Sequence, residues 1–354
     1  MNDQELIPCP ATNGPLTAYS FDQYLNHKEL DWAVEDLLPK KALAILYGAS
    51  GSGKTFAALD LVMAIAEGLP WFSHTTVQGR VWYLVLEGEF GFQTRLAARL
   101  AYYGAGSDNI RFVTGQFSLI NPKEVEELIG FIHRNGGADV VVVDTLNQAA
   151  LGINENSSGD MGLVISGTRS LRDQLDALVV LVHHAGKNRA RGPRGHSSLY
   201  AAADAVMLVT RKGDTGEITL EKSKDGPDGI AHGFRLQSVE IGKSASGKSM
   251  ASCVLVPTDG TAPPPRKPEP KGTNQRALLY AFFEILVQQK LDAFVNGEED
   301  IPGISIDDAV ARFDDVFEHV AVKHRKYRLQ ETIESLVVNG FLSRRGDHII
   351  LRNH

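Results

Sequence analysis

Short apolar runs alternate with longer helical patterns between residues 31 and 257. The runs are rich in Val, Leu and Ile and lack polar alternation, which is typical of strands covered by helices on both faces. Strands that alternate with helical patterns indicate βα units and a mostly parallel sheet. The predicted buried strands are Leu43–Tyr47, Val81–Leu86, Asp139–Val143 and Leu178–Val182.

The pattern changes beyond Ala205, where strands are separated by turns rather than by helices. We expect strands around Glu217–Lys222, Gly233–Glu240 and Met250–Val256. Their close spacing predicts antiparallel hairpins that close one edge of the sheet. The predicted fold class is therefore α/β, with a mostly parallel sheet followed by antiparallel hairpins.

Three segments flank or follow this region and predict the domain boundaries. Residues 1–30 are polar and mixed, which suggests a mobile arm, and residues 31–257 form the main domain. Residues 258–273 are rich in proline and predict a semi-extended linker. Residues 274–354 hold helical patterns and then SRRGDHIILR, a short hairpin, which together suggest a winged-helix domain.

Composition places the chain among ordinary globular proteins, with 43% hydrophobic and 22% charged residues. Its two cysteines cannot form a disulfide framework or a zinc site alone, so we expect a cytoplasmic protein. The start of the sequence lacks the features of a signal peptide, and the apolar runs are far shorter than the ~20 residues that span a bilayer. A net charge of −7 argues against a protein that coats nucleic acid over its whole surface, but it permits a local basic groove.

The stretch GASGSGKT follows a predicted strand and precedes a helical pattern, and it matches the phosphate-loop expression G-x-x-x-x-G-K-[ST]. In that setting, backbone N–H groups converge on a β-phosphate at the positive end of a helix dipole. The Lys54 ammonium would reach the β- and γ-oxygens, and the Thr55 hydroxyl would ligate Mg²⁺. The predicted ATP-binding residues are Gly48, Ala49, Ser50, Gly51, Ser52, Gly53, Lys54 and Thr55.

A second stretch, GKSASGKS at residues 242–249, satisfies the same expression. It lies between two predicted strands, and the sequence that follows it is another β run rather than a helix. No helix N-terminus would face a phosphate there. We therefore predict a flexible hairpin tip and no nucleotide site.

Polar residues end three of the predicted parallel strands. Asp144 is placed to orient the water shell of Mg²⁺ beside the phosphate loop. Glu87, which immediately ends its apolar run, is favoured over Glu89 as the group that positions the attacking water. His184 is a candidate sensor of the γ-phosphate with His183 as a supporting neighbour, although structural roles for both histidines stay open.

The segments LYGASGSGKT, YLVLEGE, VVVDTLN, VHHAGKN and RGHSSL occur in the order and approximate spacing of one family. Residues 31–257 thereby resemble the plasmid RepA-type hexameric helicases and their RecA-fold relatives. The resemblance implies a RecA-like P-loop ATPase core, with Glu87 as the catalytic base and His184 as the residue that couples hydrolysis to movement. It also implies a homo-oligomeric ring, a hexamer, with residues 187–198 as a DNA-contacting loop that faces the central pore.

That loop reads KNRARGPRGHSS and contains no acidic residue. Four cations on a glycine-containing segment suit the phosphate backbone of single-stranded DNA. The alternative is a solvated basic loop with no partner. The predicted DNA-binding residues are Lys187, Arg189, Arg191 and Arg194.

The segment ITLEKSKDGP resembles the hairpin of RecA and of DnaB-type helicases, which donates a cation to the active site of the neighbouring subunit. Lys222 and Lys224 occupy the matching positions. The alternative is a pair of exposed lysines on an edge strand. The chain departs from the plasmid family at residues 197–209, where Asp204 stands in place of a candidate arginine finger. Three alternatives stay open: the lysine pair acts in trans alone, Arg211 replaces the finger, or hydrolysis is slow.

Basic residues also crowd the last predicted helix and its hairpin near the carboxyl end. In winged-helix folds such a helix can enter the DNA major groove, while the wing touches the backbone. Such domains also dock on proteins, so the partner of this one is DNA or a replication protein. The basic residues are Lys323, Arg325, Lys326, Arg328, Arg344 and Arg345.

These expectations combine into an ATP-hydrolysing DNA translocase or helicase of plasmid or phage replication type. One alternative is a RecA-like ATPase switch or recombination mediator without unwinding activity. The other is a DNA-binding replication or regulatory factor with residual nucleotide binding, against which an intact Glu87 argues.

Overall fold

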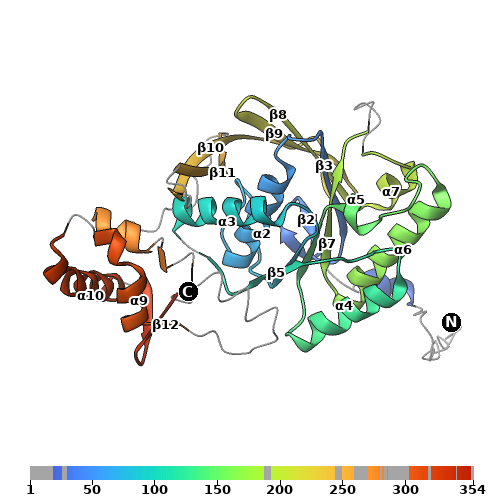
Figure 1. Cartoon of the computed structure of the whole chain (residues 1–354). Helices are drawn as coiled ribbons and strands as arrows, with labels where there is room; N and C mark the ends of the chain where they lie inside the picture. Colours follow the sequence, from blue (N-terminus) through green and yellow to red (C-terminus); the bar gives the residue numbers. More distant parts are fainter. Residues whose placement is uncertain are drawn as a thin grey trace, which may run out of the picture.

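A mixed sheet, with nine strands among the described residues, forms the centre of the larger part of the chain (Figure 1). Its strand order is β11-β10-β9-β8-β3-β7-β6-β4-β5, and the six strands from β8 to β5 are parallel neighbours. The parallel strands are β3 (Leu43–Gly48), β4 (Val81–Val85), β5 (Ile110–Thr114), β6 (Val140–Asp144), β7 (Leu178–His184) and β8 (Ala205–Lys212). This computed structural model describes residues 19–25, 30–104, 106–186, 193–243, 249–258, 270, 272–279, 281–282, 285, 303–317, 320–339 and 341–351.

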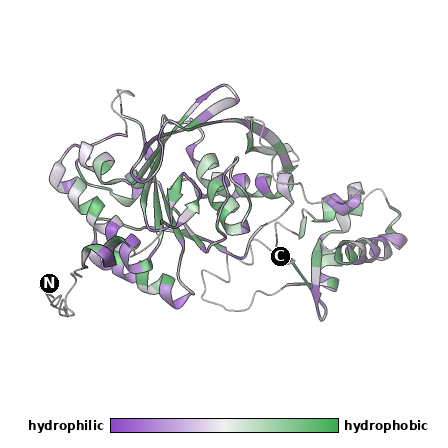
Figure 2. Cartoon of the chain, turned by 180° about the vertical axis from the view of Figure 1, so that it is seen from behind, coloured by the Kyte–Doolittle hydropathy of each residue, from purple (hydrophilic) through white to green (hydrophobic). Residues whose placement is uncertain are grey.

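Helices cover both faces of the sheet, and this explains the unbroken apolar runs. Alternate residues of β3 enter different cores: Ala44 and Leu46 pack toward α2, whereas Ile45 packs on the opposite face. Figure 2 shows hydrophobic strands in the middle and polar helix surfaces outside. One face carries α2 (Lys54–Glu67) and α3 (Glu89–Tyr103), and the other carries α4 (Pro122–Arg134), α5 (Leu146–Ala149), α6 (Ser158–Leu175) and α7 (Ser197–Ala202).

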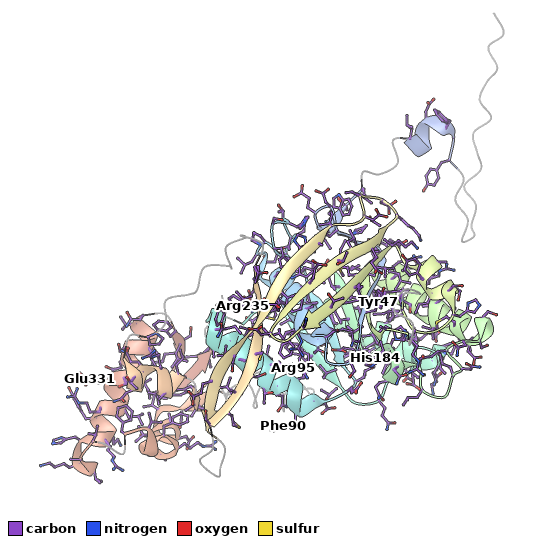
Figure 3. The ribbon with its side chains drawn as sticks, turned by 90° about the horizontal axis from the view of Figure 1, so that it is seen from above. Tyr47, Phe90, Arg95, His184, Arg235 and Glu331 are labelled. Atoms are coloured by element: carbon purple, nitrogen blue, oxygen red, sulfur yellow. The ribbon has the colours of Figure 1, made fainter. Side chains whose placement is uncertain are left out.

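Antiparallel hairpins extend one edge of the sheet, as the sequence predicted. β9 (Thr215–Ser223) pairs with β8, and β10 (Ala231–Lys243) pairs with both β9 and β11 (Ser249–Pro257). The long β10–β11 pair runs over α3, with which both strands are in contact (Figure 3). Together with the parallel strands, this arrangement is that of the predicted RecA-like P-loop core.

The second match to the phosphate-loop expression lies between β10 and β11. Lys243 and Ser249, which flank residues 244–248, face each other in the antiparallel ladder. Residues 244–248 lie outside the described residues. The segment therefore joins two strands and does not precede a helix.

The carboxyl-terminal part has its own hydrophobic core, which includes Phe282, Phe313 and Leu329. The predicted hairpin is present, and its turn contains Gly346 at φ 64°. An additional short strand, β12, pairs with β14. The elements are β12 (Ile304–Ser305), α9 (Ile306–Arg312), η2 (Asp314–Phe317), α10 (Val322–Val338), β13 (Leu342–Arg345) and β14 (His348–Leu351).

Near the amino end, the described residues contain a short helix, α1 (Phe21–Leu25), and a two-stranded sheet of β1 (Trp32–Val34) and β2 (Leu38–Pro39). Most of the predicted arm at 1–30 and of the predicted linker at 258–273 lies outside the described residues. Among the residues that the structure describes, we find no helix with the length and apolar character needed to cross a bilayer.

Candidate nucleotide site

The phosphate loop connects the end of β3 to the start of α2. Gly48 is the last residue of β3, and a Cβ atom there would lie 2.3 Å from the carbonyl oxygen of Val209, so only glycine fits. Gly51 and Gly53 have φ angles of 73° and 97°, which glycine adopts at little cost. Lys54 begins α2, so the loop delivers its backbone N–H groups to a helix N-terminus.

The Lys54 side chain folds back over this loop. Its ammonium donates to the carbonyl oxygens of Gly48 at 3.1 Å and Ala49 at 2.9 Å, and the residue is 7% exposed. Burial lowers the pKa of Lys54, while the negative charges of Asp144 and Glu87 act in the opposite direction. The ammonium therefore lies at the loop, in the field of both predicted carboxylates.

Asp144 ends β6 and is 5% exposed. It accepts a hydrogen bond of 2.7 Å from the Tyr83 hydroxyl and another from the Thr55 side chain. Burial raises the pKa of Asp144, and these two hydrogen bonds lower it. The Thr55 hydroxyl and the Asp144 carboxylate together form a pair of hard oxygen ligands, which fits Mg²⁺.

Glu87 lies two residues beyond the end of β4 and is exposed to solvent. Its Oε2 accepts a hydrogen bond of 3.2 Å from the hydroxyl of Thr145, the residue that follows Asp144. Glu89, by contrast, is already the first residue of α3. The structure therefore ties Glu87, the favoured candidate, to the segment that follows β6.

His184 ends β7 directly beside the phosphate loop. It is opposite Gly48 in the parallel register, and the next residue, Ala185, donates its N–H to the Gly48 carbonyl at 2.9 Å. Burial lowers the pKa of His184, the charge of Lys54 lowers it further, and the charge of Glu87 opposes both. His183 is buried, and its Nε2 lies 2.8 Å from the Arg194 carbonyl oxygen.

The four predicted groups therefore come from four neighbouring parallel strands. β3, β7, β6 and β4 are adjacent in that order, and they supply Gly48, His184, Asp144 and, just beyond β4, Glu87. All four lie at the carboxyl ends of their strands, where ligands bind in open α/β sheets. Tyr47 and His184 are labelled on two of these strands in Figure 3.

Lys222 and Lys224, the predicted trans lysines, lie away from the nucleotide site of their own chain. The Lys222 ammonium donates to the carbonyl oxygens of Tyr200, Ala201 and Ala203 at 2.7, 3.1 and 2.8 Å, at the carboxyl end of α7. The Lys224 ammonium pairs with the Asp204 carboxylate at 2.7 Å.

The setting of the pair bears on both predicted roles. Lys222 is level with Val206 and hence with Ile45, three residues before the phosphate loop begins. β10 pairs with Thr215–Thr219 of β9, before Lys222, and Lys224 lies beyond the end of β9, so the trans role and the edge-strand alternative both stay predictions. Positive charge at a helix C-terminus is favourable, and it gives the pair a role within the chain.

Only part of the predicted basic loop lies within the described residues. Lys187, Arg189 and Arg191 lie outside the described residues. The Arg194 guanidinium pairs with the Glu155 carboxylate at 2.7 Å, and the Arg194 backbone N–H donates to the His184 carbonyl at 2.9 Å. An acid from another segment thus pairs with the last cation of a loop that contains no acid itself.

In the carboxyl-terminal part, the basic residues of α10 and the β13–β14 hairpin are mostly exposed. Several have acidic neighbours: Lys326 lies 3.8 Å from Asp307, and Arg328 lies 3.0 Å from Glu331. These surface pairs contribute little to stability, so the side chains can exchange partners.

Tyr83 was missed by the sequence reasoning, and Asp204 and Arg211 make contacts that the sequence did not predict. Tyr83 donates to Asp144, and a buried tyrosine within an apolar strand is a signal that could have revealed it, because its hydroxyl requires a partner. Asp204 accepts the Leu43 N–H at 2.8 Å and pairs with Lys224, so it fixes strand ends. Arg211, considered as a finger, contacts the phosphate loop of its own chain.

Comparison with known proteins bears on the class of this ATPase core. A family model described as an AAA domain matches residues 16–190, just under half of the chain, and this range contains Lys54, Glu87, Asp144 and His184. No curated protein matches the chain at a significant level. Among solved structures, the chain is similar to the KaiC-like protein PH0186 from the hyperthermophilic archaeon Pyrococcus horikoshii OT3, with 16% identity, a TM-score of 0.41, and coverage of 64% of this chain and 94% of that chain. The family match and the sheet topology together support a RecA-like P-loop ATPase.

Proposed function

We propose that this chain hydrolyses ATP and uses the energy to move along single-stranded DNA, as a translocase or helicase that works as a ring oligomer. One observation carries the ATPase step: the phosphate loop, Asp144, Glu87 and His184 meet at the carboxyl ends of neighbouring strands. Binding alone would need only the loop and the aspartate. A glutamate held by Thr145 beside them adds a group that can orient water.

In the proposed reaction, the loop amides and the Lys54 ammonium hold the triphosphate, and Thr55 and Asp144 hold Mg²⁺, which neutralises charge on the phosphates. Glu87 orients a water for in-line attack on the γ-phosphorus, and the bond to the β,γ-bridging oxygen breaks to leave ADP and phosphate. His184 pairs with Gly48 in the parallel register, and the chain after His184 leads into the basic loop. His184 is therefore suited to respond to release of the γ-phosphate and to transmit that change to residues 187–198.

The DNA step rests on charge. Lys187, Arg189, Arg191 and Arg194 occur within eight residues directly after the strand that carries His184. Such a cluster suits a phosphate backbone, and its place in the sequence just after His184 would couple the two ligands. We further propose that the carboxyl-terminal part acts as a winged-helix domain that binds DNA or a replication protein.

A second candidate is an ATP-controlled switch or recombination mediator that does not unwind DNA. It is favoured by the engagement of Lys222, Lys224 and Arg211 within their own chain. A site that lacks a donated cation hydrolyses slowly, by a factor on the order of 10³–10⁵ in finger-dependent enzymes. Slow turnover suits a switch better than a motor.

The test measures the ATPase rate with and without single-stranded DNA, together with the mass of the protein in ATP. A motor should show DNA-stimulated hydrolysis and a ring-sized mass, and unwinding of a forked duplex separates it from a switch. ATP binding with neither hydrolysis nor DNA stimulation would contradict both candidates.

A further inference from the structure

Strand β8 continues beyond the end of β3 and rises beside the phosphate loop. Gly48 is the last residue of β3 and faces Val209 in the parallel register, whereas β8 runs on to Lys212. Arg211 lies two residues beyond Val209, so both side chains leave the strand on the same face. This register brings an arginine to the loop from a strand that belongs to another part of the sequence.

The Arg211 guanidinium contacts two separate turns. Its Nε and Nη2 donate to the Gly51 carbonyl oxygen at 3.0 and 2.6 Å, and its Nη1 donates to the Gly213 carbonyl oxygen at 2.5 Å. Gly51 lies in the phosphate loop, and Gly213 lies in the turn between β8 and β9. A planar fork with several fixed donors can make this arrangement, whereas a lysine ammonium can reproduce only part of it.

The grip on Gly51 fixes the orientation of one peptide plane in the loop. In a planar trans peptide the C=O of Gly51 and the N–H of Ser52 point in opposite directions. A guanidinium that holds the Gly51 oxygen therefore keeps the Ser52 N–H directed the opposite way, where it donates to the Ala49 carbonyl at 3.1 Å. Gly51 has φ 73° and no side chain, so the contacts of Arg211 and the Ser52–Ala49 hydrogen bond together restrain this plane.

We propose that Arg211 is a positioning residue that preorganises the phosphate loop of its own subunit for the triphosphate. The inference rests on the proposed nucleotide function and deepens it. A loop that is already ordered loses little conformational entropy when the nucleotide binds. The contacts of Arg211 with Gly51 and Gly213 form a clamp that orders the loop in this way, so the clamp strengthens nucleotide binding. The clamp also ties the loop to the β8–β9 turn, so this turn responds to occupancy of the loop.

The same residue would behave differently as a finger donated to a neighbour. A finger stabilises the transition state, so its loss lowers kcat and leaves nucleotide affinity nearly unchanged. A cis clamp acts on the loop of its own chain, so its loss raises Kd and KM and changes kcat less. The two roles are separated by which constant moves.

The experiment compares wild type, Arg211→Met and Arg211→Lys for binding of a fluorescent ATP analogue, for KM and kcat, and for amide hydrogen exchange of residues 50–53 without nucleotide. Arg111→Met is the matched control, since Arg111 is also an exposed strand arginine that donates to a carbonyl, that of Asp108, at 3.0 Å. We expect Arg211→Met to raise Kd and KM about tenfold and to speed loop exchange by a similar factor, as loss of a charged hydrogen bond predicts. Arg211→Lys should give an intermediate effect and Arg111→Met none.

Unchanged Kd and unchanged loop exchange in Arg211→Met would overturn the proposal, and a selective fall in kcat would assign the residue to a neighbour's site instead. Should Arg211→Met fail to fold, Arg211→Lys carries the same comparison. If the wild type binds no nucleotide, the proposed function fails, while the exchange measurement still decides whether the clamp exists.

Discussion

Two segments of this chain satisfy the same phosphate-loop expression, and they have opposite surroundings. Residues 48–55 leave a buried parallel strand and enter α2. Residues 242–249 leave β10 and enter β11, which turns back along it. The letters are equivalent, but only the first segment delivers its backbone N–H groups to a helix N-terminus.

The neighbours of the two lysines differ as well. Lys54 lies in the field of Asp144 and Glu87, which come from adjacent strands of the same sheet. The second segment joins β10 to β11, and β11 is the outermost strand of the sheet among the described residues. A phosphate site thus depends on strand order, which brings carboxylates to the loop, as much as on the loop itself.

The largest effect should come from replacing the two motif lysines in turn. Lys54→Ala removes the ammonium from the loop, and we expect turnover to fall by about 10³ or more and nucleotide binding to be lost. Lys248→Ala should leave both unchanged. Binding of a fluorescent ATP analogue checks this, and equal damage from the two substitutions would break the comparison.

Glu87 sharpens the comparison because it follows a parallel strand beside the first segment, whereas the second segment lies between two antiparallel strands. Glu87→Gln keeps the shape and the contact with Thr145 but removes the charge that orients water. We expect kcat to fall on the order of 10²–10³ while nucleotide affinity stays within about twofold. Single-turnover hydrolysis measures the step. Glu89→Gln is the matched control and should retain most activity, since Glu89 begins α3.

Much of this arrangement could be predicted from sequence because it follows from local patterns. The buried strands β3, β4, β6 and β7 carry unbroken apolar runs; Gly48 ends the first, and Glu87, Asp144 and His184 close the other three. β5 was missed because it is the edge strand of the parallel part, and its half-exposed residues give it no such run.

Contacts between distant segments could not be predicted in this way. Arg194 meets Glu155, and Arg211 meets Gly51, 160 residues earlier in the chain. Both contacts depend on how far one element extends past another, and the spacing of apolar residues along the sequence does not give this extent. The sequence signalled that these cations mattered, but it could not say which carbonyl or carboxylate each would contact.

Substitution of the lysine pair tests whether a cation from β9 acts at the nucleotide site formed by residues 48–55. Lys222→Ala removes three contacts to the end of α7, and we expect the melting temperature to fall by about 2–4 °C, as loss of ~1 kcal/mol predicts. If the pair also acts on a neighbour, mixing Lys222→Ala with Glu87→Gln subunits should partly restore turnover. Restoration without a change in melting temperature would contradict the role within the chain.

The smallest expected effect concerns His184, which adjoins the first segment. Burial and Lys54 lower the pKa of His184 below its ordinary value of 6.5. The unfolded chain therefore binds the proton more tightly than the folded chain, so the contribution to stability is present above pH 6.5 and is lost as the pH falls below it. Burial raises the pKa of Asp60 to about 6, so protonation of Asp60 stabilises the folded chain as the pH falls, opposite to the effect of His184. Only a difference between variants therefore isolates the contribution of the histidine.

We expect the free energy of unfolding of the wild type to fall, relative to His184→Asn, by a few tenths of a kcal/mol between pH 7 and pH 5.5, since solvent screens a half-buried ring. Denaturant titrations at both pH values measure this difference, and a difference of the opposite sign would mean that Glu87, rather than Lys54 and burial, dominates the field at His184.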